Sequence, residues 1–148
     1  MRKLTLLLPF VLLMTTAAEC GTNRTGSQRP VHCEVLVDGP KKAEDRDIIV
    51  GNVRFNCDKP GAEPLTLKIK LDKKDGDQWH TATNKTFTIR GLDTNAGAFE
   101  HQSRTVELKC GSGVFRTVVD WTRDSRGASE SDTETSGVVK DPCASFRH

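Results

Sequence analysis

The sequence lacks the short motifs that mark common enzyme active sites. It contains no Gly-x-Ser-x-Gly elbow, no His-Glu-x-x-His pair and no Gly-rich phosphate loop. Asp120, His101 and Ser112 are the residue types of a hydrolase triad, but nothing in their spacing supports one. The sequence therefore predicts a protein that is not an enzyme, with no catalytic residues and no cofactor.

Metal-ligand spacing is missing as well. The histidines His32, His80 and His101 are scattered and form no paired motif of the kind that holds zinc. The aspartates within 72–77 lie close together, yet they lack the alternate oxygen ligands and the distant glutamate of an EF-hand loop. We therefore expect no metal site.

Neither an excess of one charge nor a membrane-spanning run is present. The chain has 22 Lys and Arg against 20 Asp and Glu. Two of the basic residues, Arg2 and Lys3, lie at the very start of the chain, so the remainder is close to neutral. Basic and acidic residues are interleaved without a basic stripe, which argues against nucleic acid as a partner. The longest apolar run, Leu4–Met14, is shorter than the ~20 residues that a membrane helix needs.

The N-terminal segment has the features of a secretory signal peptide. A short positive segment, Met1–Lys3, precedes the apolar run, and small residues follow up to Ala18. Residues 1–18 are predicted to be this signal, and the polar residues 19–30 a flexible leader. The protein is therefore expected to be secreted into the extracellular space, with one folded domain after the leader.

The first cysteine leaves two alternatives open. Cys20 at the signal boundary could be lipidated, which would make the protein a cell-surface lipoprotein and is the only route to membrane contact. Glu19 argues against this alternative, because the residue before a lipidated cysteine is normally small. Cleavage after Ala18 would instead release the protein with Cys20 as a free thiol.

Alternation of apolar and polar residues predicts an all-β fold. In 65–71, four aliphatic residues alternate with threonine and lysine, and Asp75-Gly76 just beyond predicts a hairpin turn. The pattern predicts seven strands, at 31–37, 48–57, 65–71, 79–89, 104–110, 114–121 and 137–140. We expect an immunoglobulin- or fibronectin-like antiparallel β-sandwich of about seven strands over 31–143, followed by a tail at 144–148. Polar loops are predicted at 41–47, 92–101 and 122–136.

The two tryptophans receive different predictions. Trp121 shares a strand face with Phe115 and Val119 and is expected in the core. Trp79 opens a strand beside a turn, in register with Phe87 and Ile89, and is expected to be half exposed.

Export makes disulfides the expected state of the four remaining cysteines. Four cysteines allow three pairings, and the strand order favours one of them. Cys33 and Cys57 lie at the same end of the first hairpin, whereas Cys110 and Cys143 flank the last two strands at the opposite end. We therefore expect Cys33–Cys57 and Cys110–Cys143, each contributing roughly 3–4 kcal/mol. The alternative Cys57–Cys110 would have to join opposite ends of the sandwich.

At these residues the chain resembles small exported β-sandwich proteins of actinobacteria. The segments that carry the resemblance are Cys33, Val53–Cys57, Leu65–Leu71 followed by Trp79, and Cys110-Gly-Ser-Gly-Val-Phe-Arg116. The resemblance spans Cys33 to Cys143. It implies an immunoglobulin-like fold and export, and it transfers no active residues because the functions of these proteins are largely unknown.

The sequence thus predicts a secreted, non-catalytic binding or surface-interaction module whose loops contact an extracellular protein or glycan. An exported protease inhibitor and a small-ligand carrier are the alternatives. Two glycosylation sequons, at Asn23 and Asn84, apply only in a eukaryotic host.

Overall fold

The computed structural model describes residues 29–144. The predicted signal peptide, Cys20, Asn23 and all but the first residue of the predicted tail lie outside the described residues. Within that range the chain folds into eight strands and one short 3-10 helix, η1. The strands are β1 (Cys33–Lys42), β2 (Ile48–Cys57), β3 (Ala62–Asp75), β4 (Gln78–Gly91), β5 (Gln102–Lys109), β6 (Val114–Ser125), β7 (Ala128–Thr135) and β8 (Val139–Lys140).

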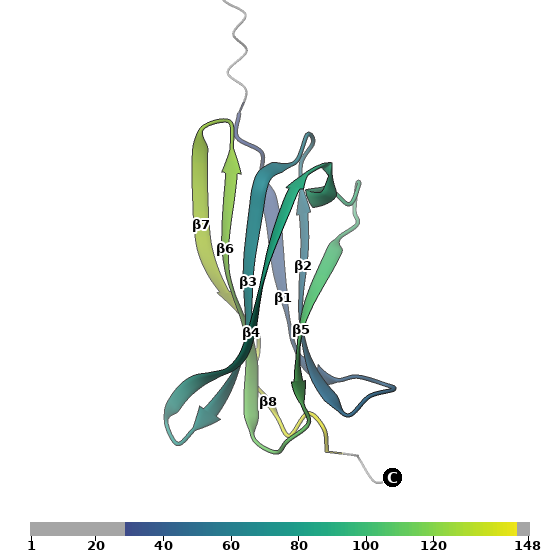
Figure 1. Cartoon of the computed structure of the whole chain (residues 1–148), viewed down its shortest axis with the longest axis vertical. Coiled ribbons are helices and arrows are strands. Elements are labelled where there is room, and N and C mark those ends of the chain that lie inside the picture. Colours follow the sequence, from purple (N-terminus) through teal and green to yellow (C-terminus); the bar gives the residue numbers. More distant parts are fainter. Residues whose placement is uncertain (1–28, 145–148) are drawn as a thin grey trace, which may run out of the picture.

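The strands form two antiparallel sheets that face each other (Figure 1). The first sheet has the order β1-β2-β5. The second has the order β4-β3-β6-β7, and β8 also pairs with β6. The antiparallel β-sandwich predicted from the sequence is therefore confirmed, with eight strands in place of about seven.

The core lies between the two sheets. On β3, Leu65, Leu67, Ile69 and Leu71 are all fully buried, as the alternation in the sequence predicts. β2 supplies Val53 and Phe55 from the other sheet, and β6 supplies Phe115, Val119 and Trp121, with Trp121 only 7% exposed. Burial of apolar area of this kind is the main favourable term in folding.

Two disulfides close opposite ends of the sandwich, and both match the predicted pairing. Cys33–Cys57 joins directly opposed residues of β1 and β2, with Cα atoms 4.0 Å apart. Cys110–Cys143 joins the residue after β5 to the segment after β8, with Cα atoms 5.9 Å apart. The first disulfide is buried in the core, and the second is half-buried.

The prediction of a loop at 122–136 is wrong. β6 continues to Ser125, and β7 follows after a two-residue turn. β7 has no large apolar side chain, because it is the outermost strand and seven of its eight residues are exposed. The loop predicted at 41–47 is shorter than expected, since β1 extends to Lys42.

Trp79 also lies on the other face of its strand from the one predicted. The register between β3 and β4 shifts at Ala82, so Trp79 pairs with Lys74 on the outer face, whereas Phe87 points inward. The ring packs against Arg116, whose guanidinium carbon is 4.2 Å from the ring centroid. A bulge of this kind turns all residues beyond it to the opposite face.

Candidate functional site

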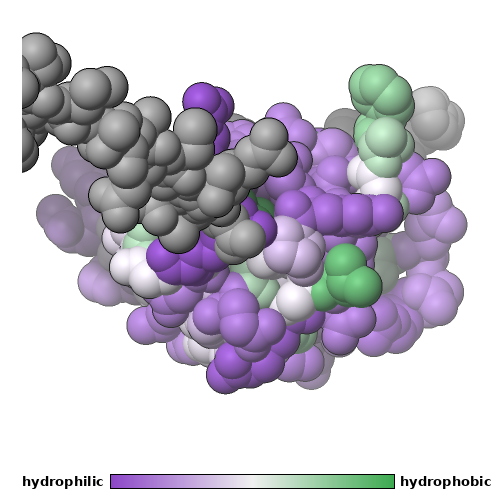
Figure 2. All heavy atoms as spheres, turned by 90° about the horizontal axis from the view of Figure 1, so that it is seen from above, coloured by the Kyte–Doolittle hydropathy of each residue, from purple (hydrophilic) through white to green (hydrophobic). Residues whose placement is uncertain are grey.

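The loop between β4 and β5, residues 92–101, projects from one end of the sandwich and is called here the Phe99 loop. The side chain of Phe99 is fully exposed (102%), and Leu92 in the same loop is 64% exposed. Figure 2 views this end from above and shows isolated apolar groups on a mostly hydrophilic surface. Single exposed apolar residues are common on protein surfaces, so exposure alone does not mark a site. Phe99 is distinguished because its full exposure is combined with a left-handed backbone, on a loop that side-chain hydrogen bonds hold in place. This loop is therefore the candidate functional site.

The first half of the loop is anchored by a buried threonine. η1 (Leu92–Thr94) ends at Thr94, whose hydroxyl donates to the Gly91 carbonyl at 2.6 Å and accepts from the Ala62 backbone N–H at 2.9 Å. Gly61 packs so closely here that a Cβ atom would lie 1.8 Å from the Gly91 carbonyl oxygen. With its φ of 95°, this position accepts only glycine.

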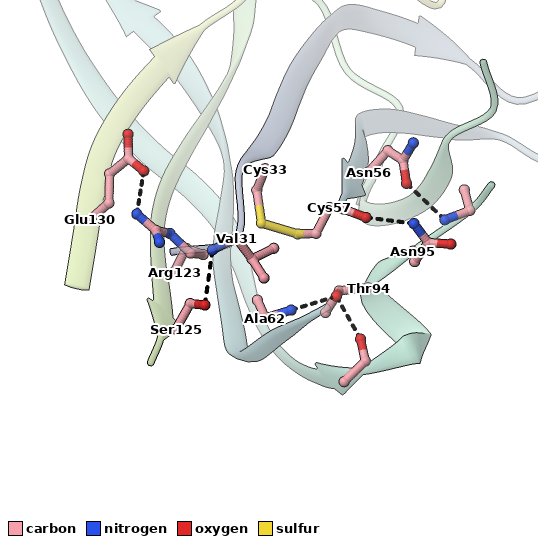
Figure 3. The surroundings of a disulfide bond; sticks show 12 residues. Val31, Cys33, Asn56, Cys57, Ala62, Thr94, Asn95, Arg123, Ser125 and Glu130 are labelled. Carbon is pink, nitrogen blue, oxygen red and sulfur yellow. Dashed lines mark hydrogen bonds and ion pairs between the residues drawn. A yellow bond between two sulfur atoms is a disulfide. The ribbon is translucent and has the colours of Figure 1, made fainter. Parts of the chain in front are cut away.

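Two asparagines attach the second half of the loop to β2, beside the Cys33–Cys57 disulfide (Figure 3). Asn95 Nδ2 donates to the Cys57 carbonyl at 2.6 Å. Asn56 uses both ends of its amide: Oδ1 accepts from the Ala96 N–H at 2.8 Å, and Nδ2 donates to the Gly97 carbonyl at 2.9 Å. The loop is therefore fixed to the disulfide-linked end of the first sheet.

The tip of the loop holds Phe99 in an unusual backbone conformation. Phe99 has a φ of 63°, in the left-handed region that bulky residues rarely adopt. Between the tip and the β2–β3 turn lies an open depression of about 480 Å³. Its lining includes Asn56, Asp58 and Lys59 on one side and Phe99 on the other. The tip thus presents an aromatic ring next to a polar hollow.

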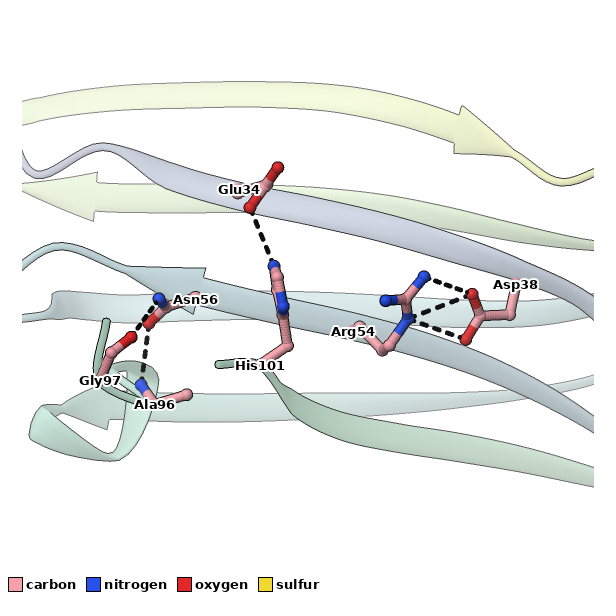
Figure 4. Close-up of polar contacts among 7 residues, drawn as sticks. All are labelled: Glu34, Asp38, Arg54, Asn56, Ala96, Gly97 and His101. Carbon is pink, nitrogen blue, oxygen red and sulfur yellow. Dashed lines mark hydrogen bonds and ion pairs between the residues drawn. The ribbon is translucent and has the colours of Figure 1, made fainter. Parts of the chain in front are cut away.

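Polar side chains continue from the loop along the outer face of the first sheet (Figure 4). His101 Nε2 lies 2.9 Å from Glu34 Oε2 on β1. Farther along, the Arg54 guanidinium donates to both oxygens of Asp38, and Asn52 Nδ2 donates to Asp38 Oδ2 at 2.6 Å. The hydrogen bond from Arg54, reinforced by that from Asn52, holds the pKa of Asp38 below its ordinary value.

The structure separates the residues of the imagined triad. Asp120 lies on the outer face of the second sheet, where its bond to Lys70 at 2.8 Å lowers its pKa. His101 lies over the outer face of the first sheet, and Ser112 lies in the exposed turn between β5 and β6. Asn84 of the second sequon is exposed on β4.

Within residues 29–144, no three His, Cys, Asp or Glu residues gather closely enough to hold a metal ion. No helix in this part of the chain has the length and apolar character needed to cross a bilayer.

The chain matches no protein-family model, no curated protein sequence and no solved structure.

The loop 92–101 is among the contact loops predicted from the sequence, but Phe99 itself is not singled out there. One signal at 95–100 could have identified it: Phe99 is the only large apolar residue in a stretch of Asn, Ala, Gly and Glu, with no apolar partner two positions away. An apolar residue without apolar neighbours at every second position does not belong to the buried face of a strand, so it is expected to be exposed.

Proposed function

We propose that the protein is a secreted, non-catalytic binding module that contacts an extracellular protein through the Phe99 loop. The observation that supports this proposal is the full exposure of Phe99 on a loop that hydrogen bonds at Asn95, Ala96 and Gly97 hold against β2. The two disulfides are compatible with an extracellular location. The immunoglobulin-like class of the sandwich is part of the same proposal, supported by the three-stranded and five-stranded sheets and by the crossing of β5 to the first sheet.

An exposed aromatic ring on a rigid loop suits a protein partner better than a glycan. Binding energy at protein interfaces is concentrated in a few aromatic and arginine side chains that fill pockets on the partner. Because the loop is already ordered by Asn56, Asn95 and Thr94, little conformational entropy is lost on binding. The expected partner therefore has an apolar pocket that accepts the Phe99 ring.

The local chemistry supports binding in preference to catalysis. The two carboxylates whose pKa is lowered, Asp38 and Asp120, each bind a cation on a sheet face and do not converge on a common cavity. The left-handed φ of Phe99 is also unlike the extended backbone that a substrate-like inhibitor offers to a protease. The same loop thus favours pocket insertion over substrate mimicry.

A photo-crosslinking amino acid at position 99, placed in the exported chain in its producing cells, tests the proposal. We expect a discrete cross-linked protein at position 99. The same probe at Val138, which is 58% exposed on the segment between β7 and β8, is the control and should not capture that protein. Absence of a cross-link at position 99, or the same products from both positions, would refute the proposal.

Measuring the affinity of the captured partner for variants then distinguishes the role of Phe99, which contacts the partner, from that of Asn56, which holds the loop. Phe99→Ala should weaken binding by about 30-fold, which corresponds to a loss of about 2 kcal/mol at an interface anchor. Asn56→Ala keeps the Phe99 side chain but removes both amide bonds that position the loop, so it should weaken binding less than Phe99→Ala. Val138→Ala is the matched control and should bind as the unmodified protein does.

A further inference from the structure

Two strands at opposite edges of the second sheet have one side free of strand partners. In residues 29–144, β4 pairs only with β3, and β7 pairs only with β6 (Figure 1). Each edge leaves a row of backbone N–H and C=O groups that a further strand could pair with.

The inward face of β7 is acidic. Glu130, Asp132 and Glu134 lie opposite Arg123, Trp121 and Val119 of β6 and therefore point to the core side of the sheet. They remain exposed because the first sheet has only three strands, and β1 covers β6 without extending fully over β7. Only Glu130 has an ion-pair partner among the described residues, Arg123 at 2.6 Å.

The opposite edge, formed by β4, has basic side chains beside it that form no ion pair within the described residues. Open depressions of about 430 and 310 Å³ lie between β4 and β5. Lys85 on β4 and Arg104 on β5 line them, and neither has a carboxylate at ion-pair distance within residues 29–144. Two carboxylates are nearby: Glu107, which binds Arg46, and Asp93 at the loop end.

The two edges match in register. Lys85 lies opposite Ile69, Ile69 opposite Val119, and Val119 opposite Glu134, so the acid and the base stand at the same level of the sheet. By the same pairing, Asp132 stands level with Phe87, which lines one depression together with Arg104. A copy displaced along the sheet, and turned by the sheet's own twist, would bring Glu134 opposite Lys85 and Asp132 opposite Phe87, beside the depression that Arg104 lines.

The outward faces of the same edges also match. Thr133 of β7 stands level with Thr86 of β4, and Ser131 stands level with Thr88. Hydroxyl pairs of this kind are favourable across antiparallel strands. Strand direction fits too, because adjacent strands alternate throughout β4-β3-β6-β7, so β7 of one copy would meet β4 of the next antiparallel.

We propose that the protein associates with copies of itself head to tail, with β7 of one copy adding to β4 of the next. The acidic row on β7 opposes pairing of β7 with a second β7, and it favours the basic edge. Because the two contacting surfaces differ, the contact is heterologous, and each added copy offers a free edge to a further copy. This association uses the sides of the sandwich and is independent of the Phe99 loop.

Sedimentation of the secreted protein over a concentration series tests the proposal. The mean mass should rise with concentration at low salt and fall when salt is added, because the attraction is between exposed charges. Glu134→Lys and Lys85→Glu should each raise the concentration needed for association about tenfold or more. The double variant, in which the charges are exchanged, should recover the association.

Two controls keep the result specific. Glu44→Lys reverses an exposed charge on the β1–β2 loop, away from both edges, and Phe99→Ala removes the proposed partner anchor. Both should associate as the unmodified protein does, and all variants should show the same thermal unfolding midpoint. A protein that stays monomeric at low salt and high concentration, or a double variant that does not recover association, would overturn the proposal.

Discussion

At the residue scale, the two tryptophans occupy opposite environments. Trp121 lies on the inner face of β6 opposite Leu67, and only 7% of it is exposed. Trp79 lies on the outer face of β4, half-buried beneath Arg116 and Lys74. Burial between the sheets and stacking under a guanidinium differ in strength, because the first removes the whole ring from water.

We expect Trp121→Ala to lower the free energy of unfolding by about 3–5 kcal/mol, since it leaves a large cavity in the core. Trp79→Ala should cost about 1 kcal/mol, the scale of an exposed cation–π contact. Urea denaturation of the two variants measures the difference. Equal small shifts in midpoint would contradict the core position of Trp121.

The acid dependence of stability should depend in part on Asp38. Its folded pKa is lowered by Arg54 and Asn52, so the stabilisation is fully present above the ordinary value of 3.8 and is lost as the pH falls through the lower folded value. Asp38→Asn should therefore lower stability slightly at neutral pH and flatten the loss of stability below pH 3.8. Unfolding midpoints measured from pH 7 to pH 2 test this, with Asp45→Asn on the β1–β2 loop as the control.

At the scale of elements, β7 and the Phe99 loop show how a segment is held without apolar packing of its own. β7 is aligned with β6 by paired residues from Val118↔Thr135 to Ser125↔Ala128. The Phe99 loop depends on single side chains, chiefly Thr94, Asn95 and Asn56. Its position is therefore sensitive to small changes in the neighbouring β2–β3 turn.

Gly61→Ala should destabilise the β2–β3 turn and displace the start of the Phe99 loop, because the new Cβ atom would lie 1.8 Å from the Gly91 carbonyl oxygen. Gly76→Ala in the β3–β4 turn is the matched control: its φ of 58° is also left-handed, but no atom lies within 4 Å of the Cβ position. The control should cost about 1–2 kcal/mol from backbone strain alone. Chemical denaturation should show a larger cost for Gly61→Ala, and equal costs would mean that the turn adjusts without resistance.

At the scale of the whole molecule, the two disulfides close opposite ends of the sandwich and differ in accessibility. Cys33 and Cys57 are 5% and 1% exposed, whereas Cys110 and Cys143 are half-buried at the end that holds β8. Attack by an external thiolate requires access to a sulfur atom.

Mild reduction of the folded protein should therefore break Cys110–Cys143 first and Cys33–Cys57 only on unfolding. Alkylation of the freed thiols followed by peptide mass analysis measures the order. The partly reduced protein should lose about 3–4 kcal/mol of stability and remain folded. Earlier alkylation of Cys57 would show that the Phe99 end opens before the β8 end.

The sequence alone determined the features that depend on alternation and on strand order. The burial of the four aliphatic residues in 65–71 follows from it, because an apolar residue at every second position indicates a strand with one buried face. The Asp75-Gly76 pair likewise predicts the turn at Gly76, and the strand order predicts both disulfide pairs. Cysteines at the same end of adjacent strands can then be paired from the strand order.

Only the tertiary structure decided the features that depend on contacts between distant segments. β7 carries no burial pattern, because it lies beyond the edge of the first sheet and is held by hydrogen bonds to β6. A register shift at Ala82 places Trp79 on the outer face, and the sequence hides this shift because Trp79 and Phe87 are both apolar and an even number of positions apart. Asn56 holds the Phe99 loop from β2, and Glu134 of β7 stands at the same level of the sheet as Lys85 of β4. Both relations involve residues from different strands or loops, so they exist only once the sheets are assembled.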